Sequence, residues 1–470
     1  MSLRRIPYPV KSKPGRKRPP EGARYSAWKI LDEWEEGKSS LESIRERSFA
    51  HSLLSARDRA LVMELTQGVV RHRLLLDHRI DALLDKPKNQ LPEQVRNLLR
   101  LGIYQIIFLQ KIPIHAAVNE IVRATKKTRY AGLTPLVNAV LRRASTAPQT
   151  SMPDPGMDPA GHMSLVNSMP RWLVDRLIDQ WGISETRRIL QATNHPGPMA
   201  IRVNTLKTDR DSLLEELDLL GLPARPGRIS PDAILIERGI APLTLSPFRE
   251  GRCTVQDEGA QLIAPLLNPE PGEIMVDACA APGGKAGHLA QIMGGSGSVI
   301  AVDRSSGRLQ QMTRQALARL GINSVHLLAA DVRSFPRLFS CPPDKILLDA
   351  PCSGTGVIRR HPEGKWRKDP EGIVDLIRMQ NVLLKAAGDC LAPGGRLLYS
   401  TCSILQEENE EVVTRFLEEA DFMLEDLRVR FGDLGPSLFT SRGELRTWPQ
   451  LHNCDGFYAA MLVKKTRWAG

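Results

Sequence analysis

Apolar residues recur at helical spacing through residues 23–147, as in the series Leu61, Leu65 and Val69. This period is typical of helices that bury one face, and an alternating strand pattern is absent from this part of the sequence. Pro92 and Glu93 stand in the favoured early positions of one such helix. We therefore expect an all-α domain of five to seven helices over residues 23–147.

The pattern changes after residue 147. Residues 148–168 collect Pro, Ser, Met and Gly without periodicity, which predicts a linker. Helices and strands alternate in residues 169–268. This alternation is too short for a full nucleotide-binding sheet, so it predicts a small α+β subdomain. Its expected elements are a helix at 171–193, a strand at 200–204, a helix at 209–220 and a strand at 233–237.

Residues 269–470 repeat strand and helix units. Short runs of Val, Ile and Leu separated by amphipathic helices are typical of a mostly parallel sheet that is covered on both faces, with right-handed crossovers. This pattern predicts a doubly wound α/β architecture. Strands are expected at 274–278, 299–302, 325–328, 346–348, 397–400 and 457–463, with helices between them that include 308–320, 371–391 and 407–419.

Basic residues outnumber acidic ones: the 470 residues include 64 Lys and Arg against 53 Asp and Glu, for a formal charge of +11. Such an excess favours polyanionic partners such as nucleic acid. The basic, Pro-rich segment 1–22 predicts a disordered tail, either a phosphate-binding arm or a solvated terminus without a further role. Eight residues of the helical domain predict a basic face, for RNA contact or as ordinary solvated charge: Arg71, Arg73, Arg79, Lys126, Lys127, Arg129, Arg142 and Arg143.

Several classes of protein are excluded by composition. The sequence lacks the roughly 18 consecutive apolar residues of a membrane helix, and its start lacks the apolar segment of a secretory signal. These patterns predict a cytoplasmic protein without a membrane partner. The seven scattered cysteines include no Cys-x-x-Cys pair. They predict neither a disulfide framework nor a structural zinc site, and we expect no bound metal.

The first four expected strands of the α/β part each lead to an aspartate. In a doubly wound sheet, ligands bind outside the carboxyl ends of the strands. The small, glycine-rich segment 277–285 lets the backbone and a helix N-terminus approach a ligand closely. An acidic residue after the second strand can accept both hydroxyls of a ribose, which predicts a nucleoside-containing cofactor, although helix capping is the alternative role. The four residues are Asp277, Asp303, Asp331 and Asp349.

Two cysteines follow neighbouring expected strands and should lie above the same pocket: Cys352 after the fourth strand and Cys402 after the fifth. A zinc-dependent deaminase is excluded, because Thr355 stands where the second cysteine of its Pro-Cys-x-x-Cys motif should be. A nicotinamide-dependent dehydrogenase is disfavoured, because segment 280–284 lacks the Gly-x-Gly-x-x-Gly spacing. Outside the glycine-rich segment, the other cysteines are interpreted as ordinary small apolar residues: Cys253, Cys341, Cys390 and Cys454.

These motifs resemble those of a known family, the S-adenosylmethionine-dependent RNA cytosine-C5 methyltransferases of the NOL1/NOP2/Sun group. The resemblance implies a Rossmann-like class I methyltransferase domain at the C-terminus, preceded by the small α+β subdomain. The helical part resembles a NusB-type RNA-binding domain. The segments that carry the resemblance are 277–285, 349–356, 399–403, 256–261 and 202–206, and for the helical domain 98–105 and 113–120.

The resemblance also implies a cofactor, a substrate and residue roles. S-adenosyl-L-methionine would supply a methyl group to carbon 5 of a cytosine in small-subunit (16S) ribosomal RNA. Cytosine C5 is a poor nucleophile, and addition of a thiolate to C6 activates it. Cys402 is implied as the attacking thiol and Cys352 as the residue that assists product release, while Asp349 and Lys285 support the reaction. The implied cofactor-binding residues are Cys279, Ala280, Ala281, Pro282, Gly283, Gly284, Lys285, Asp303, Asp331 and Asp349.

Two alternatives remain open at this point. The substrate could be another RNA such as transfer RNA, or the protein could be a noncatalytic RNA-binding assembly factor. The retained cysteines, aspartates and Gly-Gly-Lys turn count against the second alternative, since a relic has no physical reason to keep them all. We expect a monomer.

Overall fold

The computed structural model describes residues 22–50, 52–84, 91–146, 150–236 and 244–466. The chain divides into two compact units, unit 1 (Met1–Ser151) and unit 2 (Met152–Gly470). Of the predicted basic tail, residues 1–22, only the last residue is described.

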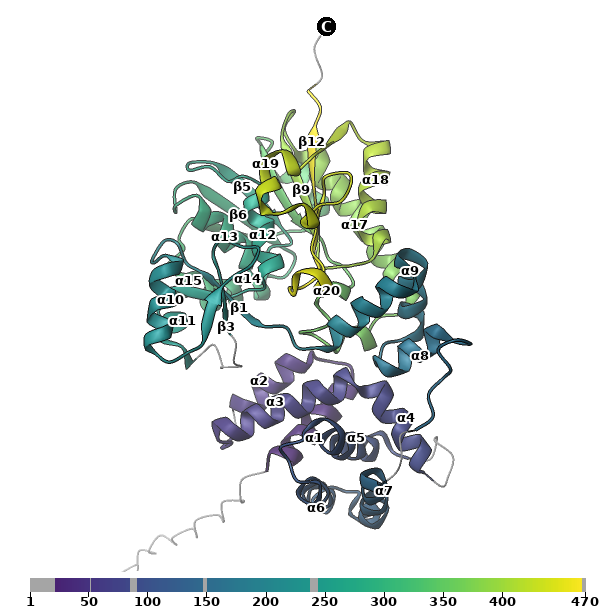
Figure 1. Cartoon of the computed structure of the whole chain (residues 1–470). Helices are drawn as coiled ribbons and strands as arrows, with labels where there is room; N and C mark the ends of the chain where they lie inside the picture. The colour runs from purple at the N-terminus through teal and green to yellow at the C-terminus, as the bar shows by residue number, and fades with distance from the viewer. Residues whose placement is uncertain (1–21, 51, 85–90, 147–149, 237–243, 467–470) are drawn as a thin grey trace, which may run out of the picture. The chain divides into compact units, whose positions relative to one another are not determined.

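Unit 1 is helical in its described part, as the sequence predicts (Figure 1). Its α-helices bury apolar side chains that include Val62, Leu98 and Ile121, none of which is exposed. Burial of one face of each helix thus stabilises the bundle. The helices are α1 (Ala23–Glu35), α2 (Leu41–Ala50), α3 (Ala56–Arg71), α4 (Arg73–Leu83), α5 (Glu93–Phe108), α6 (Ile114–Thr125) and α7 (Thr134–Thr146).

Part of the predicted basic face turns inward. Arg71 is buried, and Arg73 donates hydrogen bonds to Glu35 and Glu93 at 3.0 and 3.2 Å. Arg100, whose side chain is only 2% exposed, joins the same cluster by pairing with Glu93 at 2.6 Å. The expectation of an open basic face is therefore wrong for Arg73, because its charge is used to neutralise carboxylates within the bundle.

A short helix, α8 (Pro159–Val166), lies inside the segment that the sequence predicts as a linker. Asp158 caps it, since its carboxylate accepts a hydrogen bond from the backbone N–H of Gly161 at 2.9 Å. Pro159 occupies an early helical position, where a missing N–H is harmless. Capping rather than apolar periodicity therefore stabilises this helix, and periodicity alone could not predict it.

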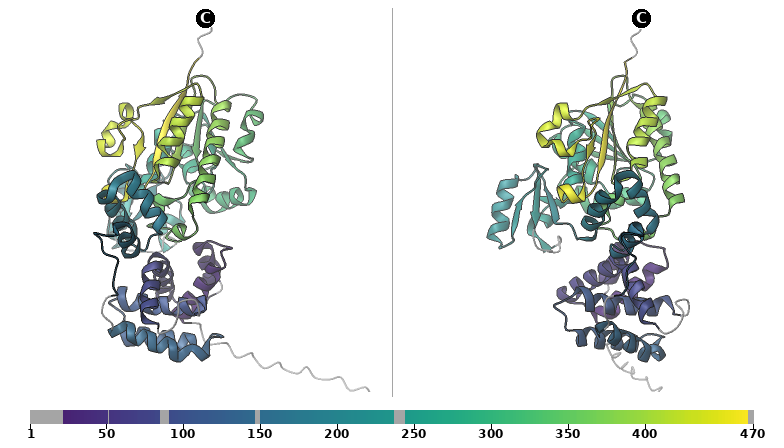
Figure 2. Two further views of the ribbon diagram at one scale, coloured as in Figure 1. Left: turned by 90° about the vertical axis from the view of Figure 1, so that its right-hand side faces the viewer. Right: turned by 45° about the vertical axis from the view of Figure 1, so that its right-hand side comes forward.

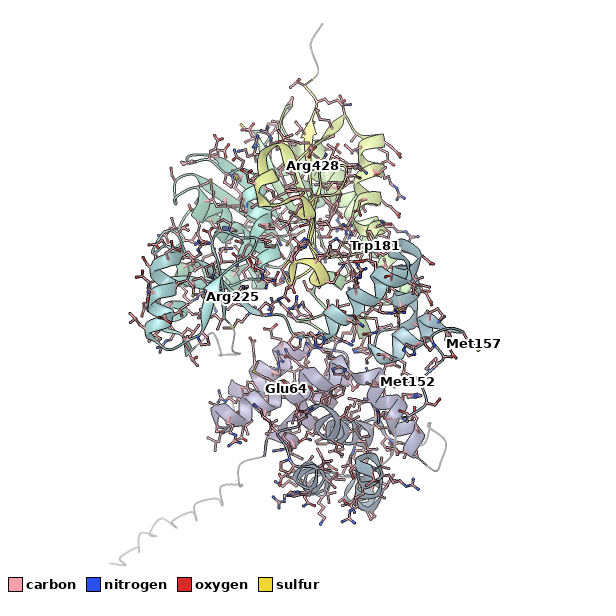
Figure 3. The ribbon with its side chains drawn as sticks, in the orientation of Figure 1. Glu64, Met152, Met157, Trp181, Arg225 and Arg428 are labelled. Atoms are coloured by element: carbon pink, nitrogen blue, oxygen red, sulfur yellow. The ribbon has the colours of Figure 1, made fainter. Side chains whose placement is uncertain are left out.

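The long helix α9 (Arg171–Asn194) agrees with the predicted helix, apart from a break in helical geometry at Gly182. Beside the break, Trp181 packs edge-on against Trp448 with ring centroids 4.9 Å apart. Figure 3 labels Trp181 on this helix, and Met152 and Met157 on the chain that leads to α8. α9 is thereby packed against the C-terminal part of unit 2, in which Trp448 directly precedes α20 (Pro449–His452).

A small antiparallel sheet projects from the side of unit 2, as the right-hand view of Figure 2 shows. Its strand order is β2-β3-β1-β4. Ile201, Leu213 and Ile234 form part of its apolar core. The predicted helix and two strands are confirmed here, whereas two strands of three residues each were not predicted. The elements are β1 (Met199–Val203), α10 (Arg210–Leu219), β2 (Ala224–Pro226), β3 (Ala233–Ile236), α11 (Ser246–Arg249) and β4 (Cys253–Val255).

The larger sheet of unit 2 has the order β10-β12-β9-β8-β5-β6-β7, with β11 paired to β12. The five strands from β9 to β7 are parallel, and β12 and β10 add antiparallel pairs at one edge. All six predicted strands are confirmed. The strands are β5 (Ile274–Ala278), β6 (Ser298–Asp303), β7 (Val325–Ala329), β8 (Lys345–Asp349), β9 (Arg396–Thr401), β10 (Phe422–Glu425), β11 (Leu445–Arg446) and β12 (Tyr458–Lys464).

Helices cover both faces of the large sheet (Figure 1). Met275 of β5 faces a cluster that contains Leu289 of α13, and its neighbour Val276 faces the opposite cluster with Leu384 of α17. This alternation is the doubly wound arrangement that the sequence predicts. The helices are α12 (Glu258–Leu266), α13 (Gly284–Ile292), α14 (Ser306–Met312), α15 (Ala318–Leu320), α16 (Phe335–Leu338), α17 (Pro370–Cys390), α18 (Glu410–Glu419) and α19 (Arg428–Phe431).

Candidate active site

The strand order creates a topological switch point between β5 and β8. From β5 the chain proceeds outward through β6 and β7, and it then returns to build β8 and β9 on the other side. Loops that leave the two central strands in opposite directions open a crevice at their carboxyl ends. Asp277 of β5 and Asp349 of β8 therefore lie at the point of the sheet where a ligand is expected.

The glycine-rich loop joins β5 to α13. The N–H of Ala280 donates to the carbonyl of Val302 at 2.9 Å, which fixes the loop to the neighbouring strand. Gly283 has a φ of 99°, and a β-carbon there would approach the Met312 side chain to 2.5 Å. Glycine is required at this position, and the loop delivers the N-terminus of α13 to the crevice.

A cavity of about 420 Å³ opens beside this loop. Three of the predicted cofactor-binding residues line it: Cys279, Asp303 and Asp331. The lining does not include Asp349, Cys352 or Cys402. It does include Pro351, which lies between Asp349 and Cys352 in sequence. Apolar side chains suited to a flat base complete the wall, namely Val332, Met379, Val382 and Leu383.

Asp303 is only 5% exposed and lies at the carboxyl end of β6. Its carboxylate accepts a hydrogen bond from the N–H of Ser305 at 2.9 Å and pairs with Arg308 at 3.3 Å. Arg308 also donates to the carbonyl of Ala281 at 2.6 Å, so it ties the glycine-rich loop to α14. Sequence reasoning missed Arg308, which has no motif of its own.

Asp277 is fully buried, and its carboxyl oxygens have no hydrogen-bond partner within bonding distance among the described residues. Burial, together with the nearby Asp349 carboxylate, raises the pKa of Asp277 well above its ordinary value. A buried carboxyl group of this kind needs a polar partner, which a ligand can supply. Asp303 is part of the cavity lining and Asp277 is not, and the cavity with the Asp303 carboxylate in its wall fits a cofactor that carries a nucleoside.

Asp331 has both of the roles that the sequence left open. It lines the cavity, and it also caps a short 3₁₀ helix by accepting a hydrogen bond from the N–H of Arg333 at 3.0 Å. The guanidinium of Arg333 lies 2.6 Å from its other oxygen, and these hydrogen bonds hold the pKa of Asp331 below its usual range. Asp331 therefore remains ionised at the rim of the cavity.

Lys285 and Asp349 form an ion pair at the switch point, with Nζ 2.6 Å from Oδ2. The other oxygen of Asp349 accepts a hydrogen bond from Ser400 at 3.0 Å. Burial by itself would lower the pKa of Lys285, but the Asp349 carboxylate outweighs it and leaves the pKa above its ordinary value. Lys285 therefore stays protonated within this pair, close to Cys402.

Cys352 and Cys402 come together as the sequence predicts. The loops after β8 and β9 place the two Sγ atoms 3.3 Å apart. The contact with Cys402, reinforced by burial, raises the pKa of the Cys352 thiol well above its ordinary value. Two thiols in contact cannot both ionise readily, so Cys352 is held in its protonated form.

Arg202 of β1 supports the glycine-rich loop from the small sheet. It is 1% exposed and donates to the carbonyl of Gly284 at 2.9 Å and to Gln291 at 2.5 Å. Gln256 accepts a further hydrogen bond from it. The sequence motifs at 202–206 and 256–261 thus meet at the first turn of α13, a role that the motifs alone did not indicate.

The described residues contain neither a candidate membrane span nor a candidate metal site. Their helices include none that is long and apolar enough to cross a membrane. Their His, Cys, Asp and Glu side chains form no group of three or more that could hold a metal ion.

Comparison with known families assigns all three parts of the chain. Residues 264–463 match the 16S rRNA methyltransferase RsmB/F family, residues 21–146 match the NusB family, and residues 169–242 match the ferredoxin-like domain of RsmF/B-like methyltransferases.

Whole proteins match over nearly their full lengths. The chain is 37% identical over 444 residues to the ribosomal RNA small subunit methyltransferase B of Shewanella oneidensis, covering 93% of this chain and 97% of that protein. It is 37% identical over 443 residues to the protein of the same name from Pseudomonas syringae pv. tomato, covering 94% and 96%. The crystal structure of PH0851 superimposes with a TM-score of 0.80 at 27% identity, covering 95% of this chain and 99% of that one. The chain therefore belongs to the ribosomal RNA small subunit methyltransferase B family, in which a NusB domain and a ferredoxin-like domain accompany a Rossmann-like methyltransferase domain.

Proposed function

We propose that this protein transfers a methyl group from S-adenosyl-L-methionine to carbon 5 of a cytosine in small-subunit ribosomal RNA. The single observation that carries the proposal is the pair of thiols at neighbouring strand ends, with the Cys352 and Cys402 sulfurs 3.3 Å apart. Methylation of a nucleophilic nitrogen or oxygen needs no such pair, whereas methylation of C5 needs a covalent activator and a means to release it.

The cofactor would lie in the cavity beside the glycine-rich loop. Its ribose hydroxyls would bond to Asp303, which lines the cavity. When bound, it supplies a methyl group on a positively charged sulfur. The residues proposed to hold it are Cys279, Ala280, Ala281, Pro282, Gly283, Gly284, Lys285, Asp303, Asp331 and Asp349.

Cys402 is the proposed nucleophile. Its thiolate attacks C6 of the cytosine, and the C5–C6 double bond opens so that C5 becomes electron-rich and takes the methyl group. The positive charge of Lys285, held by Asp349 at 2.6 Å, favours the anionic forms that arise during attack. Asp349 is also proposed to bond to the N3 and N4 edge of the base.

Cys352 is proposed to assist release. The C5 proton leaves, the C5–C6 double bond re-forms, and the bond between C6 and the Cys402 sulfur breaks. A protonated Cys352, 3.3 Å away, can donate a hydrogen bond to the departing sulfur. Its raised pKa suits this role, because a thiol that stays protonated remains a donor.

The remaining parts are proposed to select the RNA. We divide the chain into a tail (1–22), a NusB-like domain (23–147), a linker (148–168), an RNA-binding subdomain (169–268) and the catalytic domain (269–470). The chain as a whole has more basic than acidic residues, and this excess favours binding of a polyanionic substrate. We propose that the protein acts as a monomer in the cytoplasm and without a metal ion.

Transfer of labelled methyl from S-adenosyl-L-methionine to protein-free small-subunit ribosomal RNA tests the proposal. The wild type should produce 5-methylcytosine, identified by mass spectrometry, and Cys402→Ala should produce none because no thiolate remains to activate C5. Cys341→Ala is the matched control, since this cysteine is exposed and precedes β8, at the opposite end of that strand from the Cys352 loop. An active Cys402→Ala would remove this residue from the mechanism.

Cys352→Ala should separate attack from release. With Cys402 intact, the covalent protein–RNA adduct should accumulate and appear as a heat-stable shift on a denaturing gel. Normal turnover without that band would exclude Cys352 from the release step. If the wild type binds the cofactor but methylates only transfer RNA, the chemistry stands and the substrate is wrong; if it methylates no RNA, the assembly-factor alternative is favoured.

A further inference from the structure

A buried glutamate, Glu408, lies directly behind the two cysteine loops. It ends the short 3₁₀ helix Gln406–Glu408, which follows the Cys402 loop and precedes α18. Its side chain is 0% exposed. Burial of a carboxylate costs folding free energy unless hydrogen-bond donors surround the group. The donors around Glu408 therefore indicate which parts of the structure it stabilises.

The two carboxylate oxygens of Glu408 accept four hydrogen bonds. Oε1 accepts from the N–H of Ser353 at 2.8 Å and from the Gln380 amide at 3.0 Å. Oε2 accepts from the hydroxyls of Ser353 and Ser403 at 2.5 and 2.6 Å. Ser353 follows Cys352 and Ser403 follows Cys402, so this one side chain holds the residue next to each thiol.

Other contacts make the same junction continuous. Thr355 of the first loop lies 3.0 Å from the Ser403 hydroxyl and accepts a hydrogen bond from the N–H of Ile404 at 3.1 Å. The hydroxyl of Tyr399 in β9 donates to the backbone carbonyl of Glu408 at 2.7 Å, which fixes the glutamate to the sheet. The two loops, 50 residues apart in sequence at the thiols, are thus joined through one buried group.

We propose that Glu408 is a positioning residue that sets the separation and orientation of the Cys352 and Cys402 thiols, and thereby the rates of attack and release. The effect on the rates of attack and release rests on the proposed function. The effect on the positions of the two thiols does not. Glu408 contacts neither thiol in the described structure; it acts through Ser353 and Ser403.

The residue type matters because all four groups around Glu408 are donors. A carboxylate presents only acceptors, whereas a glutamine must turn its NH₂ group toward one pair of donors. If the amide oxygen faces Ser353 N–H and Gln380, the NH₂ group faces the two serine hydroxyls, which must then rotate to accept. Glu408→Gln therefore keeps the volume of the side chain and disturbs the link between the loops.

Disulfide formation between the two thiols measures their geometry without RNA or cofactor. Diamide takes up the two thiol hydrogens and their electrons and leaves a Cys352–Cys402 disulfide, which peptide mapping identifies. The full chain is used with Cys341→Ser, which removes the exposed thiol. We expect Glu408→Gln to form this disulfide about tenfold more slowly than the parent, since small displacements strongly affect reactions between positioned groups.

Glu444→Gln is the matched control. Glu444 is also 0% exposed, and it accepts a hydrogen bond from Tyr458 at 3.1 Å, but it contacts neither cysteine loop. This variant should form the disulfide at the parental rate. Glu408→Ala is the second variant. If Glu408→Ala does not fold, the disulfide rate of Glu408→Gln alone tests whether Glu408 positions the thiols. Equal disulfide rates in Glu408→Gln, Glu444→Gln and the parent would overturn the proposal.

Methyl transfer gives the catalytic readout. Glu408→Gln should lower kcat about tenfold or more while the Kd for S-adenosyl-L-methionine stays unchanged, because the cofactor cavity does not include Glu408. A purely structural loss would lower kcat and raise the Kd together. An unchanged kcat beside a slowed disulfide would overturn the catalytic part. If the parent itself methylates no RNA, the proposed function fails, and the disulfide rates still judge the role of Glu408 in positioning.

Discussion

Four aspartates at one edge of the large sheet occupy four different chemical environments. Asp277 is buried with a raised pKa, Asp303 is buried against Ser305 and Arg308, Asp331 is ionised beside Arg333, and Asp349 pairs with Lys285. Their positions at the carboxyl ends of expected parallel strands predicted that they lie close together, because these ends meet at the same edge of a sheet. The contacts of Asp303 and Asp331 include residues two positions later in the chain, whereas Asp349 pairs with Lys285 from a different element.

Asp303→Asn is expected to weaken binding of S-adenosyl-L-methionine by about tenfold to a hundredfold, because hydrogen bonds to a charged acceptor contribute about 1.5 to 3 kcal/mol. The amide keeps the size of the side chain but cannot accept from both ribose hydroxyls. Isothermal titration calorimetry measures the change. Asp389→Asn, on the exposed side of α17, is the control; an affinity equal to wild type for Asp303→Asn would contradict the ribose assignment.

Asp455 predicts a pH dependence of stability. Burial, together with Asp257, raises its pKa to about 7, although Arg360 and Arg359 act in the opposite direction. In the unfolded chain an aspartate has a pKa of about 3.9. The folded state therefore holds an extra proton between these values, so the free energy of unfolding falls as the pH rises from about 4 to about 7 and levels off at higher pH.

Asp455→Asn removes this titration. Relative to wild type, the variant should gain stability as the pH rises from about 5 to 8, by on the order of 1 to 3 kcal/mol. Urea denaturation at the two pH values measures the difference. If the stability difference between variant and wild type is the same at both, Asp455 does not titrate in this range.

At the scale of elements, close approaches of backbone define the site. Gly356 lies in the loop after β8, and its N–H donates to the carbonyl of Cys402 at 2.9 Å. The carbonyl of Gly356 in turn accepts a hydrogen bond from the N–H of Gly456 at 2.9 Å. A β-carbon at Gly356 would meet the carbonyl oxygen of Gly456 at 2.0 Å. The chain before β12 is therefore packed directly onto the cysteine loops.

Gly356→Ala should destabilise unit 2 by about 1 to 3 kcal/mol, as expected when a packed region is overfilled, and should reduce methyl transfer because the Cys402 loop must shift. Thermal unfolding and the methyl-transfer assay measure the two effects. Gly364→Ala is the matched control, since a β-carbon there meets no atom within 4 Å. Similar melting temperatures for both variants would refute the packing argument.

Elements were predicted where they are long and periodic. α9, α17 and six strands of the large sheet agree with the sequence pattern, whereas its short strands β10 and β11 were not predicted. β2 and β4, each of three residues, were not predicted, because two or three residues carry no measurable period. α8 depends on its cap at Asp158, which is a single local contact rather than a pattern.

At the scale of the whole molecule, the small sheet and the large sheet act as one body. Asn204 after β1 donates to the carbonyls of Gly251 and Leu320 at 2.7 and 2.8 Å, and Gln291 of α13 donates to Asn204 at 2.6 Å. These contacts join the subdomain to α13, which follows the glycine-rich loop, and to α15. The subdomain therefore belongs with the catalytic machinery in unit 2.

A chain of residues 152–470 alone is expected to fold and to bind S-adenosyl-L-methionine with unchanged affinity, because every residue of the cavity and both cysteine loops lie in unit 2. Its affinity for ribosomal RNA should fall, since the NusB-like domain is missing. Calorimetry with the cofactor and a filter-binding assay with RNA measure the two affinities. Loss of cofactor binding in a folded fragment would show that unit 1 contributes to the site.

The sequence by itself determined the architecture and the chemical inventory. Helical and strand periods are local properties, so they predicted an all-α part, a small α+β part and a doubly wound sheet, and strand ends predicted which aspartates and cysteines converge. Only the tertiary structure decided the contacts among distant residues: the 3.3 Å between Cys352 and Cys402, the support of Gly284 by Arg202 and the burial of Glu408 between two loops. These depend on how loops pack over a completed sheet, and that packing has no period along the chain.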